Sequence, residues 1–182
     1  NGKFELSNPI KNNFITDKIK EIYLSDFQIS TIFNPMNIDF KGEGKYSFND
    51  LDFLKINLEN NFKKDLLNLK LNFDYDKSLD INIINYKKSK NSIANVSLDL
   101  EKSKKNIKIN KLIFKENDNL ISIKNLGLRG NKFLYLKSIK VETSNNNFFI
   151  RNDKKILIKG TNFDATNLSK FLINQSGENK LK

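Results

Sequence analysis

The sequence predicts an all-β chain, a long antiparallel meander that forms a curved, groove-like sheet with one short C-terminal helix. Apolar and polar residues alternate in segment after segment, as they do in strands with one buried and one solvated face. Clusters rich in Asn, Asp, Gly and Lys recur about every 10 to 15 residues and favour turns. Spacings this short leave no room for crossover helices, so neighbouring strands are expected to pair antiparallel.

The individual strands follow from the same alternation. The clearest one covers residues 67–75, where every odd position is apolar or aromatic and every even position is polar. Roughly a dozen strands are expected in all, the others near residues 22–24, 38–40, 46–48, 54–58, 79–83, 96–100, 107–109, 121–123, 134–136, 139–141 and 156–158. Residues 14–22 suit either a helix or a strand.

One helix is expected at the C-terminal end of the chain. Asp164 is a candidate N-cap, and Leu168, Phe171 and Leu172 follow it at helical spacing. No linker or compositional break divides the sequence, so residues 1–182 are expected to form a single continuous module. Because the sequence begins at Asn1 without a methionine and ends in a polar run, we expect it to be a fragment of a larger protein.

The composition argues against enzymatic chemistry. Cysteine and histidine are both absent, which removes thiolate nucleophiles, imidazole bases and most transition-metal ligands. The clusters at 42–44 and 127–130 match no phosphate-binding fingerprint. Asp74, Asp76 and Asp80 could suggest calcium, but they occupy solvated strand positions and turns, where aspartate is locally favoured. The sequence therefore predicts no catalytic residues, no metal site and no cofactor.

The net charge of +11 raises the alternative of a basic nucleic-acid-binding module, because clustered cations release counterions from phosphates. Two features weaken this alternative. Only Arg129 and Arg151 are arginines, and the lysines are spread along the chain among Asp and Glu. We therefore expect a solvated lysine surface and no nucleic-acid partner.

The repeated one-sided strand is then the main functional feature. A soluble sheet must cover its apolar face with a second sheet, with helices or with a ligand, and little of the sequence is helical. Two readings stay open: a structural or adhesive β-sandwich module of the cell envelope with a dry core, and a groove that holds lipid acyl chains. The residues predicted to line such a groove are Leu69, Leu71, Phe73, Ile81, Ile83, Val96, Leu98, Ile107, Ile109, Ile121, Ile123, Ile139, Val141, Ile156 and Ile158.

The C-terminal third adds a resemblance. Residues 120–128, the segment 139–141 and the closing run 156–165, in which a strand reaches Gly160 and an Asp164-Ala165 pair follows, resemble the AsmA-like family of lipid-transport proteins, above all its large YhdP- and TamB-type members. The resemblance covers residues 120–173. Thr166 and Asn167 stand where many relatives carry a basic residue.

The resemblance implies a segment of a bridge-like protein that conducts phospholipid along a hydrophobic β-groove. The parent protein would be anchored in the inner membrane of a diderm bacterium and cross the periplasm to the outer membrane. The partners implied are phospholipid acyl chains, and the membrane through other parts of the parent chain. An excised segment would also leave open sheet edges, through which copies of the fragment could self-associate.

Overall fold

The computed structural model describes residues 2–10, 19–90, 92–130 and 132–167. Most of these residues are in strands, and the only described helical element is one short 3₁₀ turn, η1. The elements in chain order are β1 (Gly2–Ile10), β2 (Ile19–Asn34), β3 (Asn37–Ser47), β4 (Leu54–Lys63), β5 (Leu66–Tyr75), β6 (Leu79–Ile81), η1 (Asn82–Ile84), β7 (Tyr86–Lys88), β8 (Ala94–Ser103), β9 (Asn106–Glu116), β10 (Asn119–Arg129), β11 (Lys132–Thr143), β12 (Asn146–Asn152) and β13 (Ile156–Asn162).

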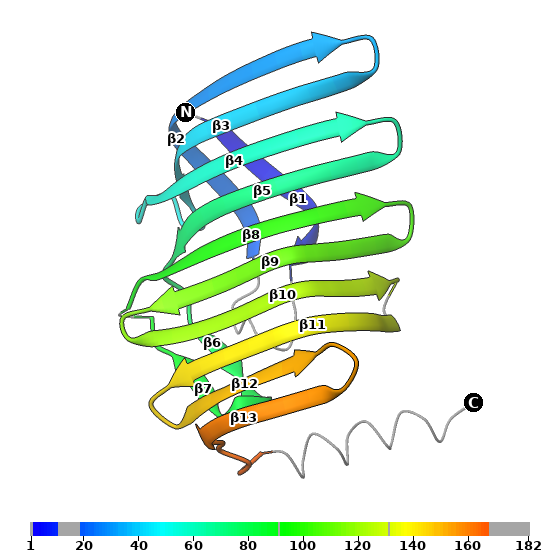
Figure 1. Cartoon of the computed structure of the whole chain (residues 1–182). Coiled ribbons are helices and arrows are strands. Elements are labelled where there is room, and N and C mark those ends of the chain that lie inside the picture. Colours follow the sequence, from blue (N-terminus) through cyan, green and yellow to red (C-terminus); the bar gives the residue numbers. More distant parts are fainter. Residues whose placement is uncertain (1, 11–18, 91, 131, 168–182) are drawn as a thin grey trace, which may run out of the picture.

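Eleven strands form one antiparallel sheet in the order β1-β2-β3-β4-β5-β8-β9-β10-β11-β12-β13 (Figure 1). Each strand pairs with the next one along the chain, except that β6, η1 and β7 are inserted between β5 and β8. The sheet does not close into a barrel, so β1 and β13 are its two edges. The predicted all-β class and antiparallel meander are confirmed.

Two sequence-based expectations need correction or fall outside the described residues. Residues 79–83 are not a strand of the main sheet: β6 pairs only with β7, and Ile83 lies in η1. The chain reverses there because Asn85, at a φ of 46°, ends the turn in the left-handed conformation that asparagine tolerates. The expected C-terminal helix after Asp164 depends on residues 168–182, which lie outside the described residues; the structure gives no support for it.

The sheet curls, so that β1 and the beginning of β2 pass behind the central strands in Figure 1. The bend in β2 coincides with a break in its register with β3 between Ser25 and Gln28, where Asp26 has a φ of 51°. A Cβ on Gly42 would lie 2.7 Å from the ring of Phe27. Glycine at this position of β3 therefore makes room for the aromatic ring at the bend.

The buried core lies between the main sheet and the inserted hairpin, not between two large sheets. Its residues come from η1 and β7 on one side and from the central strands on the other: Ile84, Tyr86, Ala94, Phe114, Ile121 and Val141. In Figure 1, β6 and β7 accordingly lie behind the sheet. The described residues contain no helix with the length and hydropathy needed to span a bilayer.

Candidate functional site

The strand register aligns apolar side chains in rows that cross the sheet. Leu71 on β5 pairs with Leu58 on β4 and with Leu98 on β8, and the same alignment continues strand by strand. Because paired residues on neighbouring strands point to the same face, these side chains form one continuous row. This central row consists of Leu58, Leu71, Leu98, Leu112, Ile123, Ile139, Ile150 and Ile158.

Two parallel rows flank the central row on the same face. The row nearer the inserted hairpin, called here the covered row, consists of Ile56, Phe73, Val96, Phe114, Ile121, Val141 and Phe148. The row on the other side, called the far row, consists of Leu69, Leu100, Ile109, Leu126 and Leu136. Together the three rows form what we call the apolar face.

The inserted hairpin packs on the covered row. Ile84 and Tyr86 are buried in the same cluster as Phe114, Ile121 and Val141, and the Tyr86 ring meets the Phe114 ring edge-on at 5.8 Å. Val141 is only 2% exposed. This side of the apolar face is therefore a dry, two-layer core.

Polar contacts hold the hairpin in place. The Tyr86 hydroxyl and the Ser92 hydroxyl both donate to the Glu116 carboxylate. The Lys88 ammonium is buried and donates to the carbonyl oxygens of Lys77, Ser89 and Ser92 at 3.0, 2.9 and 2.6 Å. Burial raises the pKa of Tyr86 and lowers the pKa of Lys88. These hydrogen bonds stabilise the insertion, and they provide partners for the polar groups that it buries.

The rest of the apolar face is accessible. Leu71, Leu98 and Ile123 in the central row are only half-buried, although their side chains are wholly apolar. At the β13 edge, Ile156 is 69% exposed and Ile158 is 67% exposed. Within the described residues, no second sheet larger than β6–β7 covers this surface. An apolar surface that is continuous and exposed in this way is typical of an interaction site.

The predicted lining residues lie mostly where the sequence places them. All of them except Ile81 and Ile83 are on strands of the main sheet, and the register puts them on one face. Ile81 and Ile83 belong to the inserted hairpin and pack against the buried cluster. They cover the face instead of forming part of it.

Sequence reasoning missed several members of the face, including Leu112 and Phe114 on β9. The cause is a bulge: Asp99 pairs with Lys111 but Leu100 pairs with Ile109, so Asn110 is an extra residue on β9. Such a residue reverses the alternation, so odd residues before it and even residues after it point to the same face. The signal was present in the sequence, since Leu112 and Phe114 also alternate, but out of phase with Ile107 and Ile109.

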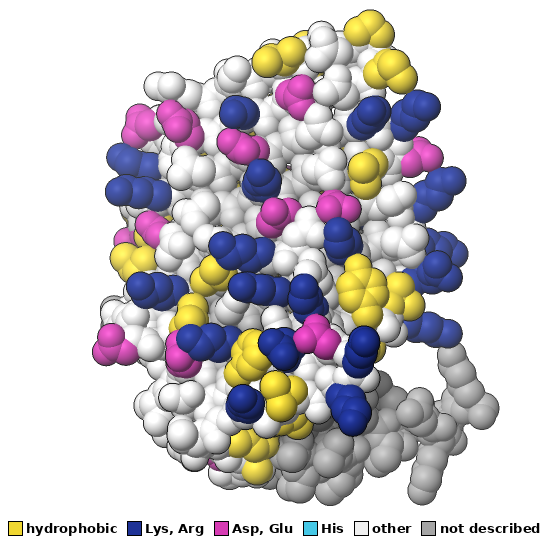
Figure 2. Space-filling view, in the orientation of Figure 1, with side chains coloured by type: hydrophobic (Ala, Val, Ile, Leu, Met, Phe, Trp, Pro, Cys, Tyr) yellow, Lys and Arg dark blue, Asp and Glu magenta, His cyan; other side chains and the backbone are white. Residues whose placement is uncertain are grey.

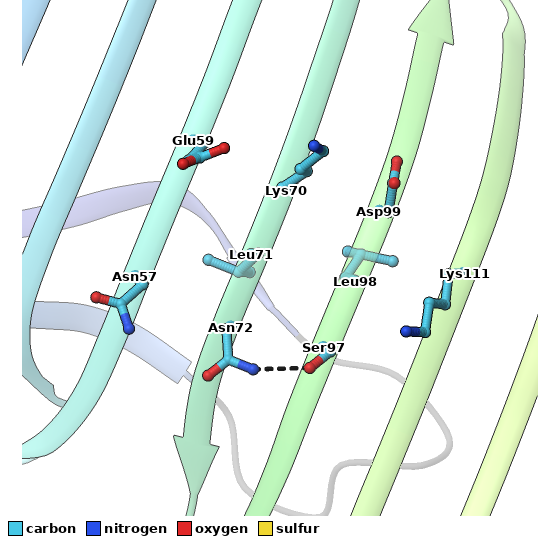
Figure 3. Close-up of a pocket in the computed structure, with 9 residues that line it drawn as sticks. All are labelled: Asn57, Glu59, Lys70, Leu71, Asn72, Ser97, Leu98, Asp99 and Lys111. Atoms are coloured by element: carbon cyan, nitrogen blue, oxygen red, sulfur yellow. Dashed lines mark hydrogen bonds between the residues drawn. The ribbon is translucent and has the colours of Figure 1, made fainter.

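The opposite face, called here the outer face, carries many charged side chains, with hydrophobic ones among them in the lower half of Figure 2. Its central side chains are Asn57, Glu59, Lys70, Asn72, Ser97, Asp99 and Lys111. They line a shallow hollow (Figure 3), which Leu71 and Leu98 of the same strands also border. Asn72 donates to the Ser97 hydroxyl at 2.7 Å, and Lys41 pairs with Glu59 at 3.3 Å. Charges of opposite sign alternate across the strands, an arrangement that suits a solvated surface.

The carboxylates considered for calcium do not converge. Asp76 lies 3.4 Å from the Lys77 ammonium, Asp80 lies 3.5 Å from that of Lys87, and Asp74 accepts a hydrogen bond from Asn95. In the part of the chain that the structure describes, no group of three or more His, Cys, Asp or Glu side chains is placed to hold a metal ion. The apolar face is therefore the strongest candidate site.

Comparison of the chain with protein-family models, with curated proteins and with solved structures gives no match.

Proposed function

We propose that this chain is a segment of a bridge-like lipid-transport protein of the AsmA-like type, in which the apolar face is the wall of a groove that conducts phospholipid. The parent protein would be anchored in the inner membrane of a diderm bacterium and cross the periplasm to the outer membrane. The observation that carries the proposal is the central row, which crosses the sheet from β4 to the β13 edge without a polar interruption and is accessible along its length.

The dimensions of the sheet suit this role. Strands about 4.8 Å apart make a sheet of eleven strands roughly 50 Å long across the strands. Strands of ten residues, such as β5 and β8, span about 33 Å, and the inserted hairpin covers only the side nearest the covered row. The remaining width is sufficient for acyl chains to lie across the strands.

The driving force would be non-specific burial. Each square ångström of apolar surface removed from water contributes about 25 cal/mol, so acyl chains are retained along the central row without a shaped pocket. The same free energy of burial is available at every strand, so a lipid would move along the central row without crossing a large barrier. The two open edges, β1 and β13, are where flanking strands of a longer groove would continue the sheet.

The competing readings receive less support. A dry sandwich requires a second sheet packed against the apolar face, and among the described strands outside the main sheet only β6 and β7 contribute to the buried cluster there. The curled β1 and the beginning of β2 pass behind the sheet (Figure 1) but add no residue to that cluster. A nucleic-acid-binding module would present aromatic side chains beside cations as stacking platforms. Here Phe73, Phe114 and Phe148 lie in the covered row, on the face opposite to Lys70 and Lys111. One aromatic ring, that of Phe149, does share an outer-face hollow with lysines, but a single ring does not make a row of stacking platforms.

The test is lipid retention by the purified chain. Extraction followed by mass spectrometry is expected to detect co-purified phospholipid with the wild-type protein and with Ser122→Asp, which adds a carboxylate to the outer face. Ile123→Asp adds the same charge to the central row and is expected to lose the lipid while remaining folded. A folded wild-type chain that neither retains nor binds phospholipid would contradict the proposal.

A further inference from the structure

The turns of the meander alternate between the two ends of the strands, so the sheet has two margins of different charge. One margin carries the turns between β2 and β3, β4 and β5, β8 and β9, β10 and β11, and β12 and β13 (Figure 1). Three neighbouring turns in its middle bring together a group of cations that we call the basic rim: Lys63, Lys64, Lys102, Lys104, Lys105 and Arg129. All six side chains are exposed.

Contacts between the three turns make the basic rim one continuous surface. The backbone N–H of Gly130, in the β10–β11 turn, donates to the carbonyl oxygen of Lys105, in the β8–β9 turn, at 2.7 Å. On the other side, the Lys104 ammonium lies 3.8 Å from the carboxylate of Asp65, in the β4–β5 turn. Arg129 donates to the side-chain oxygen of Asn106 at 3.1 Å. Cations on separate hairpins are thus held side by side.

The basic rim has almost no acidic partners. Asp65 is the only carboxylate within residues 63–66, 102–106 and 129–132, and Glu101, which precedes Lys102, is paired with Lys108. Among the described residues, Lys104 is the only cation of the rim within ion-pair distance of a carboxylate. In Figure 2 the Lys and Arg side chains along this margin form a column with few acidic side chains among them. The rim therefore has a largely uncompensated positive field.

The opposite margin differs in charge. Next to the insertion, Lys87 is paired with Asp80 and Lys77 with Asp76, and Lys88 is buried. The turns themselves carry the exposed carboxylates of Asp50, Asp52 and Asp118. The inserted hairpin also covers the apolar face on this side. The apolar face is therefore open on the side of the basic rim.

Exposed apolar side chains adjoin the basic rim. Lys102 stands in line with Leu67 on β5 and Ile107 on β9, so it lies on the same face as the far row. Phe62, which pairs with Leu67, is 46% exposed, and Phe133, which follows in the β10–β11 hairpin, is 61% exposed. Lysines whose stems lie along apolar surface and whose ammonium groups reach water are characteristic of lipid interfaces.

We propose that the basic rim binds the phosphate of anionic phospholipids whose acyl chains lie on the apolar face, so that every bound lipid has its headgroup at the same margin of the sheet. This inference rests on the proposed lipid-groove function and adds to it a lipid class and an orientation. Charge complementarity selects the anionic headgroup, and the inserted hairpin covers the apolar face on the side away from the basic rim. Among the described residues, the basic rim is therefore the cationic margin that adjoins the open part of the face.

The experiment compares two probes with identical acyl chains, phosphatidylglycerol and uncharged diacylglycerol, bound to the 182-residue chain from nonionic micelles. The rim variant Lys63→Gln/Lys102→Gln/Lys105→Gln/Arg129→Gln is matched by an outer-face variant, Lys55→Gln/Lys70→Gln/Lys111→Gln/Lys124→Gln, which removes the same charge from exposed positions. The wild-type chain and the outer-face variant are expected to prefer phosphatidylglycerol by about tenfold at low salt. The rim variant is expected to lose this preference and to bind diacylglycerol as before.

The outcomes separate this inference from the function on which it rests. Equal binding of the two probes by the wild-type chain, or an unchanged preference in the rim variant, would overturn the basic rim and leave the groove intact. An equal loss in both variants would assign the preference to net charge and also overturn the inference. Failure of the wild-type chain to bind either probe would overturn the groove and the rim together. If the chain bound inorganic phosphate as tightly as phosphatidylglycerol, the ligand of the basic rim would be free phosphate and not a lipid headgroup.

Discussion

The side-chain Nδ2 of Asn146, at the start of β12, donates a 2.7 Å hydrogen bond to the carbonyl oxygen of Ile84, in the inserted turn η1. The same side chain accepts a hydrogen bond from the backbone N–H of Asp164 at 2.9 Å. Asn146 is buried, so these bonds are shielded from water and fix the hairpin across the sheet. The hairpin's position in turn decides which part of the apolar face is covered.

Replacing Asn146 with alanine is therefore expected to loosen the insertion. The Ile84 carbonyl and the Asp164 N–H lose their partners, which should lower the free energy of unfolding by about 2 kcal/mol. Urea unfolding measures the loss, and hydrogen exchange should show faster exchange within residues 79–88. Asn147→Ala, at the exposed neighbouring position, serves as the control. Equal stability of the two variants would contradict the role given to Asn146.

A carboxylate should have different effects on the covered row and on the central row. Val141 is enclosed by the hairpin, so Val141→Asp buries an unpaired charge and should cost about 3 kcal/mol or more. Ile123 and Leu69 are half-buried, so the carboxylates of Ile123→Asp and Leu69→Asp can reach water in the lipid-free protein. Thermal melts should show a large fall in Tm for Val141→Asp and smaller falls for the other two. Unfolding of all three variants would indicate that the whole face is a dry core.

Stability should fall at alkaline pH. Burial, together with the hydrogen bond to Glu116, raises the pKa of Tyr86 above its ordinary value of 10.0, and burial raises that of Tyr46. The unfolded tyrosines ionise near the ordinary value while the folded ones stay protonated. The stability that the two tyrosines contribute is therefore fully present below about pH 10 and is lost as the pH rises above that value.

The variant Tyr86→Phe isolates one of these contributions. Lys88, whose pKa burial lowers, acts in the opposite direction, but it is present in both proteins and cancels from the comparison. Urea unfolding at about pH 9 and about pH 11 should show a smaller loss of stability for Tyr86→Phe than for the wild-type chain. An equal or larger loss in the variant would show that the Tyr86 hydroxyl is not held protonated.

The open edges should make the fragment associate at high concentration. Every residue of β13 is exposed, including Ile156 and Ile158, and unpaired edge strands are templates for further pairing. Ile158→Lys is expected to shift the association to higher concentration, because lysine on an edge strand opposes pairing. Asn72→Lys adds the same charge within the sheet and should have no effect. Sedimentation velocity measures the association, and a wild-type chain that stays strictly monomeric at high concentration would contradict the prediction.

The sequence was sufficient for the class of fold and for most of the apolar face. Alternation in residues 67–75 predicted β5 almost to its ends, because a one-sided strand has only one register that buries its apolar residues. The insertion was not predicted, since Leu79, Ile81 and Ile83 alternate as a strand of the main sheet would. Only long-range contacts, such as the hydrogen bond from Asn146 to the Ile84 carbonyl oxygen, decide that this segment lies on the sheet.

Other features depend on pairing that no local pattern reports. The bulge at Asn110 is defined by which residues of β8 oppose β9. The sequence shows the phase change from Ile109 to Leu112, but only the pairing shows that both phases point to the same face. The basic rim likewise arises from the meander. Lys64, Lys105 and Arg129 are far apart in the sequence, where lysines are spread evenly, and they meet only because alternate turns lie at the same margin.

The central claim is that lipid contacts the apolar face and not the outer face, and site-specific photo-crosslinking tests it most directly. A photoreactive side chain is placed at Leu98 or Ile123, in the central row, and at the adjacent outer-face positions Ser97 or Ser122. After the chain is loaded with radiolabelled phospholipid and irradiated, we expect lipid adducts from Leu98 and Ile123 and none above background from Ser97 and Ser122. Adducts of equal yield from both faces, or none from the central row of the folded protein, would contradict the account.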